Sequence, residues 1–202
     1  MDKKNFLIQF QSALENAQEM PQSALENAQE TDLTPSEILR VGIPFLGTPQ
    51  GSLLLSTLSS LLPNWDPQKT LESLWDPLLL PLLSAPQAYP RDTGLRASQL
   101  LLQLLSASES SSIPTYLLKK LKSETENQDL KQAIEDALLE YAIKSMRSFC
   151  AAVNSLMLQA PHRLSLMVLL TRLLKREDVP VYILLESNLL NTLLESCWVR
   201  IL

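Results

Sequence analysis

LKQAIEDALLEYAIKSMRSFCAAVNSL, residues 130–156, is the stretch that decides the fold class. Its apolar residues recur at steps of three, four or their multiples, which places them along one side of a helix: Leu130, Ile134, Ala137, Leu138, Tyr141, Phe149, Val153 and Leu156. The pattern predicts a single helix of about eight turns that starts near Thr125 and ends before Pro161.

Leucine dominates the rest of the chain as well. Roughly a fifth of the residues are leucine, whereas aromatic residues make up only 5% of the 202. Because leucine favours helix over strand, we predict an all-α protein. We expect an irregular, leucine-rich helical bundle in which short proline-capped helices are followed by longer ones.

The short helices are predicted from cap residues that stand directly before proline, at Thr34-Pro35, Thr48-Pro49, Asp66-Pro67 and Asp76-Pro77. Such a residue can cap a helix whose first turn accepts the proline, and Glu37 completes a capping box with Thr34. We therefore expect a helix from Pro35 and three compact turns over residues 48–84, with Trp65 and Trp75 buried.

The N-terminus contains the nonapeptide QSALENAQE twice, at residues 11–19 and 22–30. The apolar residues between Gln11 and Glu30 are alanine, leucine and one methionine, and Pro21 interrupts a continuous helix. We therefore expect residues 1–32 to form a mobile, flexible arm that buries little. We interpret the repeat as an in-frame duplication under little constraint; the alternative is a tandem ligand whose two equal epitopes raise avidity.

Residues 33–202 are predicted to form one all-α domain with a soft internal boundary at the serine-rich segment 106–114. We expect a loop over 84–94, then a central helix that is apolar over much of its circumference. Beyond Pro161 we expect a helix that ends near Lys175, and a last helix over about 179–198.

Residues suited to catalysis or metal binding are scattered. The single histidine, His162, has no partner at motif spacing, and Cys150 and Cys197 lie in apolar helical patterns. Glu135, Asp136 and Glu140 are expected on a solvated helix face. The sequence suggests no catalytic residue, no cofactor and no metal, and we expect the protein not to be an enzyme.

The net charge of -5 argues against general attraction to nucleic acid. The charge is uneven, because residues 1–112 carry 6 basic and 12 acidic side chains (-6) and residues 113–202 carry 11 and 10 (+1). A nucleic-acid surface would therefore lie in the second half, where two basic groups could contact phosphate: Lys119, Lys120 and Lys122, and Arg172, Lys175 and Arg176.

The apolar stripes of several predicted helices are wider than one small core needs, so we expect some of that surface to contact another protein or a second copy of the chain. The terminal residues Trp198, Ile201 and Leu202 either join the core or insert into a partner. No apolar run reaches the roughly 20 residues of a membrane span, and we expect a cytoplasmic protein.

The function that we expect is therefore a protein–protein interaction module: an adaptor, an assembly factor or a small subunit of a larger complex. The alternative is a helical subunit of a nucleoprotein assembly. The two differ in salt response, since phosphate contacts weaken steeply with salt and an apolar interface does not.

Overall fold

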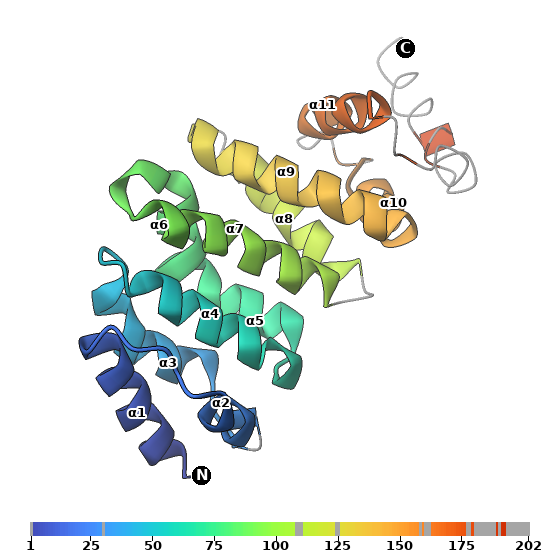
Figure 1. Cartoon of the computed structure of the whole chain (residues 1–202). Coiled ribbons are helices and arrows are strands. Elements are labelled where there is room, and N and C mark those ends of the chain that lie inside the picture. The colour runs from blue at the N-terminus through green and yellow to red at the C-terminus, as the bar shows by residue number, and fades with distance from the viewer. Residues whose placement is uncertain are drawn as a thin grey trace. The chain divides into compact units, whose positions relative to one another are not determined.

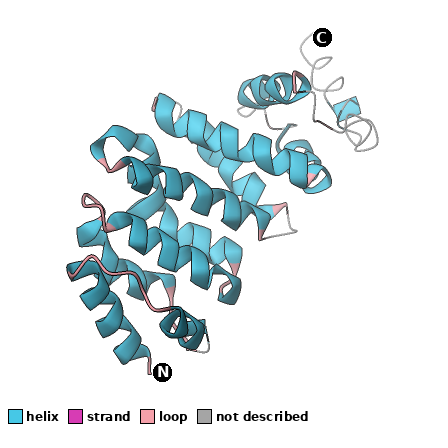
Figure 2. Ribbon diagram, in the orientation of Figure 1, coloured by secondary structure: helices cyan, strands magenta, loops and turns pink. Residues whose placement is uncertain are grey.

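The computed structural model describes residues 2–29, 31–107, 111–123, 126–157 and 163–176, together with 159, 179, 189, 191 and 192. Of residues 122, 123, 163 and 164 only the backbone is described. Across these residues the regular elements are helices, without a strand (Figure 1, Figure 2), which confirms the predicted all-α class. The chain divides into two compact units, Met1–Ala107 and Ser108–Leu202, and the division lies inside segment 106–114.

The first unit consists of helices that pack on their near neighbours in the chain. Its α-helices are α1 (Lys3–Glu15), α2 (Gln22–Gln29), α3 (Pro35–Gly42), α4 (Gly51–Leu61), α5 (Pro67–Leu74), α6 (Leu80–Ser84) and α7 (Arg91–Ser106). Short 3-10 turns, η1 (Ile43–Phe45), η2 (Leu62–Asn64) and η4 (Pro86–Ala88), lie between them. Helix α3 packs on α1, α4 and α5, and α7 packs on α4, α5 and α6. In α7, Leu100, Leu101 and Leu104 are fully buried.

Two of the four predicted helix starts occur as expected. At Thr34, the backbone N–H donates to Glu37 Oε2 over 3.0 Å, and α3 begins at Pro35. At Asp66, the carboxylate accepts from the backbone N–H of Lys69 over 2.8 Å, and α5 begins at Pro67. In both places the side chain satisfies an N–H group that the first helical turn leaves without a partner.

The predicted start at Thr48-Pro49 is displaced by two residues. The Thr48 hydroxyl donates to Phe45 O over 2.6 Å, and α4 begins only at Gly51. A Cβ atom at Gly51 would lie 2.8 Å from Leu46 O, so the tight turn before α4 requires glycine.

The predicted start at Asp76-Pro77 is wrong. Pro77 lies inside the π-helical segment η3 (Trp75–Leu79), which joins α5 to α6 without a break. A wider π turn leaves room for the proline ring and does not need its missing N–H. Trp75 is fully buried, as expected, whereas Trp65 is half-buried and donates its Nε1–H to Leu33 O over 2.7 Å.

The expectation that residues 1–32 bury little is also wrong. Phe6, Phe10 and Leu14 are at most 1% exposed, and the two phenyl rings stack with their centroids 6.2 Å apart. Ala24 and Ala28 of α2 are buried as well. The prediction rested on the composition of residues 11–30 alone. Phe6, Phe10 and Leu14 lie four residues apart, so they form one apolar side of α1 that becomes buried.

The two identical nonapeptides adopt different conformations. The first copy completes α1 and then leaves the helix at Ala17, which has a φ of 53°, whereas Ala28 at the same position of the second copy is helical and 2% exposed. Gln18 N–H donates to Ala13 O over 2.9 Å, as in a Schellman motif, where glycine is the usual residue at the position of Ala17. The nonapeptide itself therefore does not decide where its helix ends; the residues around it do, and Pro21, which follows the first copy only, prevents α1 from continuing.

Ala17→Gly and Ala28→Gly are expected to have opposite effects. Glycine at position 17 relieves left-handed strain and should raise the free energy of unfolding by about 0.5–1 kcal/mol, after allowance for the greater freedom of the unfolded chain. Glycine at position 28 weakens a helix and should lower it by about 1 kcal/mol. Urea denaturation of both variants measures this; effects of the same sign would contradict the assignment of two conformations.

An ion pair connects α1 to the start of α3. Lys3 Nζ lies 2.7 Å from Glu37 Oε1, and the hydrogen bond from Lys3, together with that from the Thr34 backbone, lowers the pKa of Glu37 from 4.5 to about 2. A lowered carboxyl pKa stabilises the fold above the unfolded pKa, and this contribution is lost as the pH falls from about 4.5 towards 2.

Glu37→Gln should therefore lower the free energy of unfolding by about 1 kcal/mol or less at pH 7, since the partly exposed pair is screened by solvent. The difference from wild type should shrink as the pH falls towards 2. Denaturation midpoints of both proteins between pH 7 and pH 2 measure this, and a difference that does not change with pH would contradict it.

The second unit contains α8 (Ser112–Ser123), α9 (Gln128–Lys144), α10 (Met146–Met157) and α11 (Arg163–Leu174). Helices α8, α9 and α10 contact one another, and α11 packs on all three.

The eight stripe residues between Leu130 and Leu156 are buried, as the periodicity indicates. The prediction of a single long helix over this stretch is wrong, because the backbone leaves the helical conformation at Ser145 (φ −138°, ψ 52°), between α9 and α10. The predicted helix over 179–198 lies almost entirely outside the described residues.

Candidate functional site

Helix α11 has two different apolar sides. Its buried side packs into the second unit through Leu166, Leu169, Leu170 and Leu173, each at most 5% exposed. On its other side, Met167, Val168 and Leu174 are 40%, 44% and 54% exposed. We call these three residues the outer apolar face. They span about 120° of the helix circumference, so they form one continuous strip.

Two polar residues lie on the same side as this strip: Thr171 within the helix, and the exposed Lys175, which directly follows Leu174. Thr171 lies between Met167 and Leu174 on the same side of α11, and its hydroxyl donates to Met167 O over 2.8 Å. The donor is thus satisfied within the helix, which leaves the methyl group as the part of Thr171 best suited to contact a neighbour.

The other exposed large hydrophobic side chains that the structure describes lie on three separate elements of the first unit. They are Ile8 on α1, Ile43 on η1 and Leu95 on α7. Single exposed apolar residues are ordinary on protein surfaces, whereas three on one side of one helix form an exposed apolar strip.

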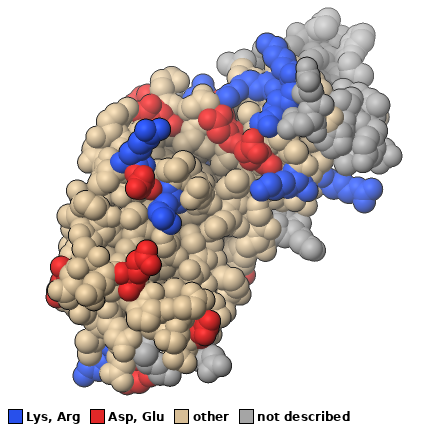
Figure 3. Space-filling model, viewed as in Figure 1, with Lys and Arg blue, Asp and Glu red and all other residues tan. Residues whose placement is uncertain are grey.

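Arg172 of α11 and Arg176, two residues after the end of that helix, pair with carboxylates of α9. Arg172 Nη1 hydrogen-bonds Glu135 Oε2, and Arg172 Nη2 lies 3.0 Å from Asp136 Oδ1. One turn further on, Arg176 Nη1 lies 2.9 Å from Glu140 Oε1. Figure 3 shows basic and acidic side chains adjacent over the second unit, whereas the drawn face of the first unit is mostly uncharged. These pairs hold α11 on α9 and set the direction of its outer apolar face.

The basic residues considered for nucleic-acid binding therefore differ in their surroundings. Arg172 and Arg176 are engaged by carboxylates, and Lys120 Nζ lies 5.6 Å from the centre of the Tyr116 ring. Lys119 and Lys175 are exposed. The side chain of Lys122 lies outside the described part of the chain. Phosphate binding by all six residues would require both arginines to exchange their carboxylate partners.

Sequence reasoning expected the acidic group on a solvated face and did not find its arginine partners. A signal was present, since Asp136 and Glu140 are four residues apart and Arg172 and Arg176 are four residues apart as well. Equal spacing allows two facing helices to form two successive ion pairs. The exposed fraction of the Glu135 side chain is only 5%, so one carboxylate of the group is buried.

Several other candidate residues lie outside the described residues, namely Trp198, Ile201 and Leu202 of the proposed partner contact, and His162 and Cys197. Cys150 is a buried thiol on α10. Among the described residues, no group of three histidine, cysteine or acidic side chains is placed to hold a metal ion. Within the same residues, no helix has the length and apolar character needed to cross a membrane.

Comparison with known proteins gives one informative similarity. No protein family matches the sequence, and no curated protein matches it. Among solved structures, the TSC1 N-terminal domain superposes on this chain with a TM-score of 0.67 and 20% sequence identity. The match covers 96% of this chain and 56% of the other, so the chain spans little more than half of the protein that it resembles. At this level of identity the similarity establishes a shared helical fold.

Proposed function

We propose that the chain is a non-enzymatic protein–protein interaction module that acts as an adaptor, an assembly factor or a helical subunit of a larger complex. The observation that supports this proposal is the outer apolar face of α11. Burial of apolar surface is the main favourable term in protein association, at roughly 25 cal/mol per Å². Met167, Val168 and Leu174 offer such surface on a helix that is already fixed to its unit by its opposite side.

The ion pairs of α11 support the same proposal. A helix that is already ordered in the free protein binds a partner more tightly, because binding then costs no further conformational entropy. Arg172 and Arg176, paired with α9, restrict rotation of α11 in this way. The partner is another protein or a second copy of this chain.

Affinity purification of the tagged chain from its native cells, followed by sizing of the recovered complex, tests the proposal. We expect Leu174→Lys to reduce recovery of the complex by about tenfold or more, because it places a charge in an apolar contact. Leu95→Lys is the matched control, since Leu95 is 60% exposed on α7, far along the chain from α11. Equal recovery with both variants would contradict a role for the outer apolar face.

Salt separates this proposal from the nucleoprotein alternative. An apolar interface should persist between about 50 and 200 mM salt, whereas binding through several phosphates should weaken by orders of magnitude. Self-association is measured on the purified chain alone, where a dimer that Leu174→Lys dissociates would identify the partner as a second copy.

A further inference from the structure

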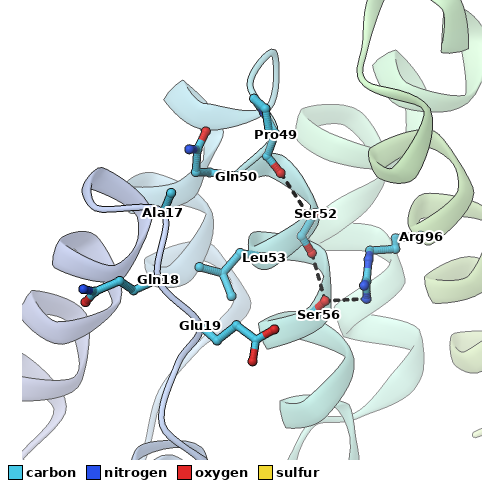
Figure 4. A pocket seen from close by; sticks show the side chains of 9 residues that line it. All are labelled: Ala17, Gln18, Glu19, Pro49, Gln50, Ser52, Leu53, Ser56 and Arg96. Carbon is cyan, nitrogen blue, oxygen red and sulfur yellow. Dashed lines mark hydrogen bonds between the residues drawn. The ribbon is translucent and has the colours of Figure 1, made fainter.

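A crevice of about 250 Å³ opens in the first unit beside the segment that follows α1. One wall is the stretch from Ala17 to Glu19, and the opposite wall is formed by α4 and by Arg96 of α7 (Figure 4). Leu53 of α4 reaches in between them. The crevice is smaller than the 300–1,000 Å³ typical of sites for drug-sized ligands. Its volume suits a small molecule.

A chain of hydrogen bonds along α4 holds Arg96 in place. The Ser56 hydroxyl donates to Ser52 O over 2.9 Å, so its only proton is used. Ser56 Oγ must therefore accept the bond from Arg96 Nη1, which has a length of 2.6 Å. This bond uses one of the five N–H donors of the guanidinium, and the other four remain available to a ligand.

The crevice carries one charge of each sign. Glu19 lies on the wall opposite Arg96, and Figure 4 shows its carboxylate directed towards α4. Among the described residues of the first unit, neither Glu19 nor Arg96 forms an ion pair, with each other or with another side chain. Two opposite charges that face one crevice without neutralising each other are complementary to a ligand that carries both signs.

This arrangement selects one class of ligand. A simple anion that approaches Arg96 is repelled by Glu19, and a simple cation that approaches Glu19 is repelled by Arg96. A free α-amino acid has a carboxylate for Arg96 and an ammonium for Glu19, and a small aliphatic side chain would contact Leu53. We propose that this crevice is a binding site for a free amino acid with a small apolar side chain.

The conformation of the first nonapeptide creates this site. Ala17, with its positive φ, turns Gln18 and Glu19 out of the helix, and Glu19 thereby reaches the crevice. In the second copy the residues equivalent to Ala17 and Gln18 are helical.

Titration of the ¹⁵N-labelled full chain with L-valine, followed by amide chemical shifts, tests the proposal. We expect saturable shifts at Ser52, Leu53 and Ser56 with a Kd of about 1 mM, as two exposed charge contacts allow. L-valine methyl ester lacks the carboxylate and N-acetyl-L-valine lacks the ammonium, so each should bind about tenfold more weakly or worse.

Variants locate the site independently of the ligand's chemistry. Arg96→Gln and Glu19→Gln should each weaken L-valine binding by about tenfold. Arg91→Gln, in the first turn of the same helix α7, and Glu15→Gln, on α1, are controls that should leave binding unchanged. Absence of saturable shifts at the three residues in wild type, or equal binding of L-valine and both blocked forms, would overturn the proposal.

Discussion

Replacement of Phe10 by alanine is expected to lower the free energy of unfolding by about 3–5 kcal/mol. The phenyl ring of Phe10 is 0% exposed, stacks on Phe6, and lies on the side of α1 that packs against α2 and α3. Its removal leaves a cavity as well as losing buried apolar area, and the two terms add. Chemical denaturation of the full chain, followed by circular dichroism, measures the loss.

Ile8→Ala is the control, because Ile8 belongs to the same helix and is 56% exposed. It should change the free energy of unfolding by about 0.5 kcal/mol or less. If Phe10→Ala were as harmless as Ile8→Ala, residues 1–32 would behave as the mobile arm that the composition of the duplicated segment suggests, and the packing of α1 described above would be wrong.

The Arg172→Met variant is expected to lose about 2–3 kcal/mol of stability. It removes the cation that faces the buried carboxylate of Glu135, and an unpaired buried charge is strongly destabilising. The value is below the full range for buried pairs because the Arg172 side chain is 34% exposed. Thermal or urea unfolding of the variant measures the loss.

Two further variants separate the ion pair from general effects at α11. Lys175→Met removes an exposed cation three residues away and should change the stability by about 0.5 kcal/mol or less. Adding Glu135→Leu to Arg172→Met removes the unpaired buried charge and should restore most of the loss. If Arg172→Met left the stability unchanged, the arginine would be available for phosphate and the nucleoprotein alternative would gain support.

The sequence predicted those features of the fold that depend on local chemistry. The caps at Thr34 and Asp66 satisfy N–H groups with side chains three residues away, and the apolar stripe of 130–156 follows from helical periodicity alone. The sequence did not predict the break at Ser145, because no proline or glycine lies near it. The serine itself was a weak signal, since serine is favoured immediately before a helix. The Asp76-Pro77 pair predicted the start of a new helix. The chain instead continues through a π-helical segment there, in which Trp75 and its leucine neighbours are buried.

The candidate contact surface was predictable only in outline. The excess of leucine indicated more apolar surface than one core uses, but which side of α11 is covered depends on its packing against α8, α9 and α10. The identical copies show a related limit, since Ala17 and Ala28 hold the same position in one nonapeptide and differ in conformation. Long-range packing decides which side of α11 is covered, and residues outside the nonapeptide, Pro21 among them, decide where each copy leaves the helix.

Site-specific photo-crosslinking in the native cell shows whether the outer apolar face of α11 contacts another protein. A photoreactive phenylalanine derivative is placed at position 174, on the outer apolar face of α11, and in a second chain at position 95, on α7. We expect a discrete protein adduct, with a partner or with a second copy of the chain, from position 174 and a much weaker one from position 95. Equal crosslinking from both positions, or an adduct with nucleic acid in place of protein at position 174, would contradict it.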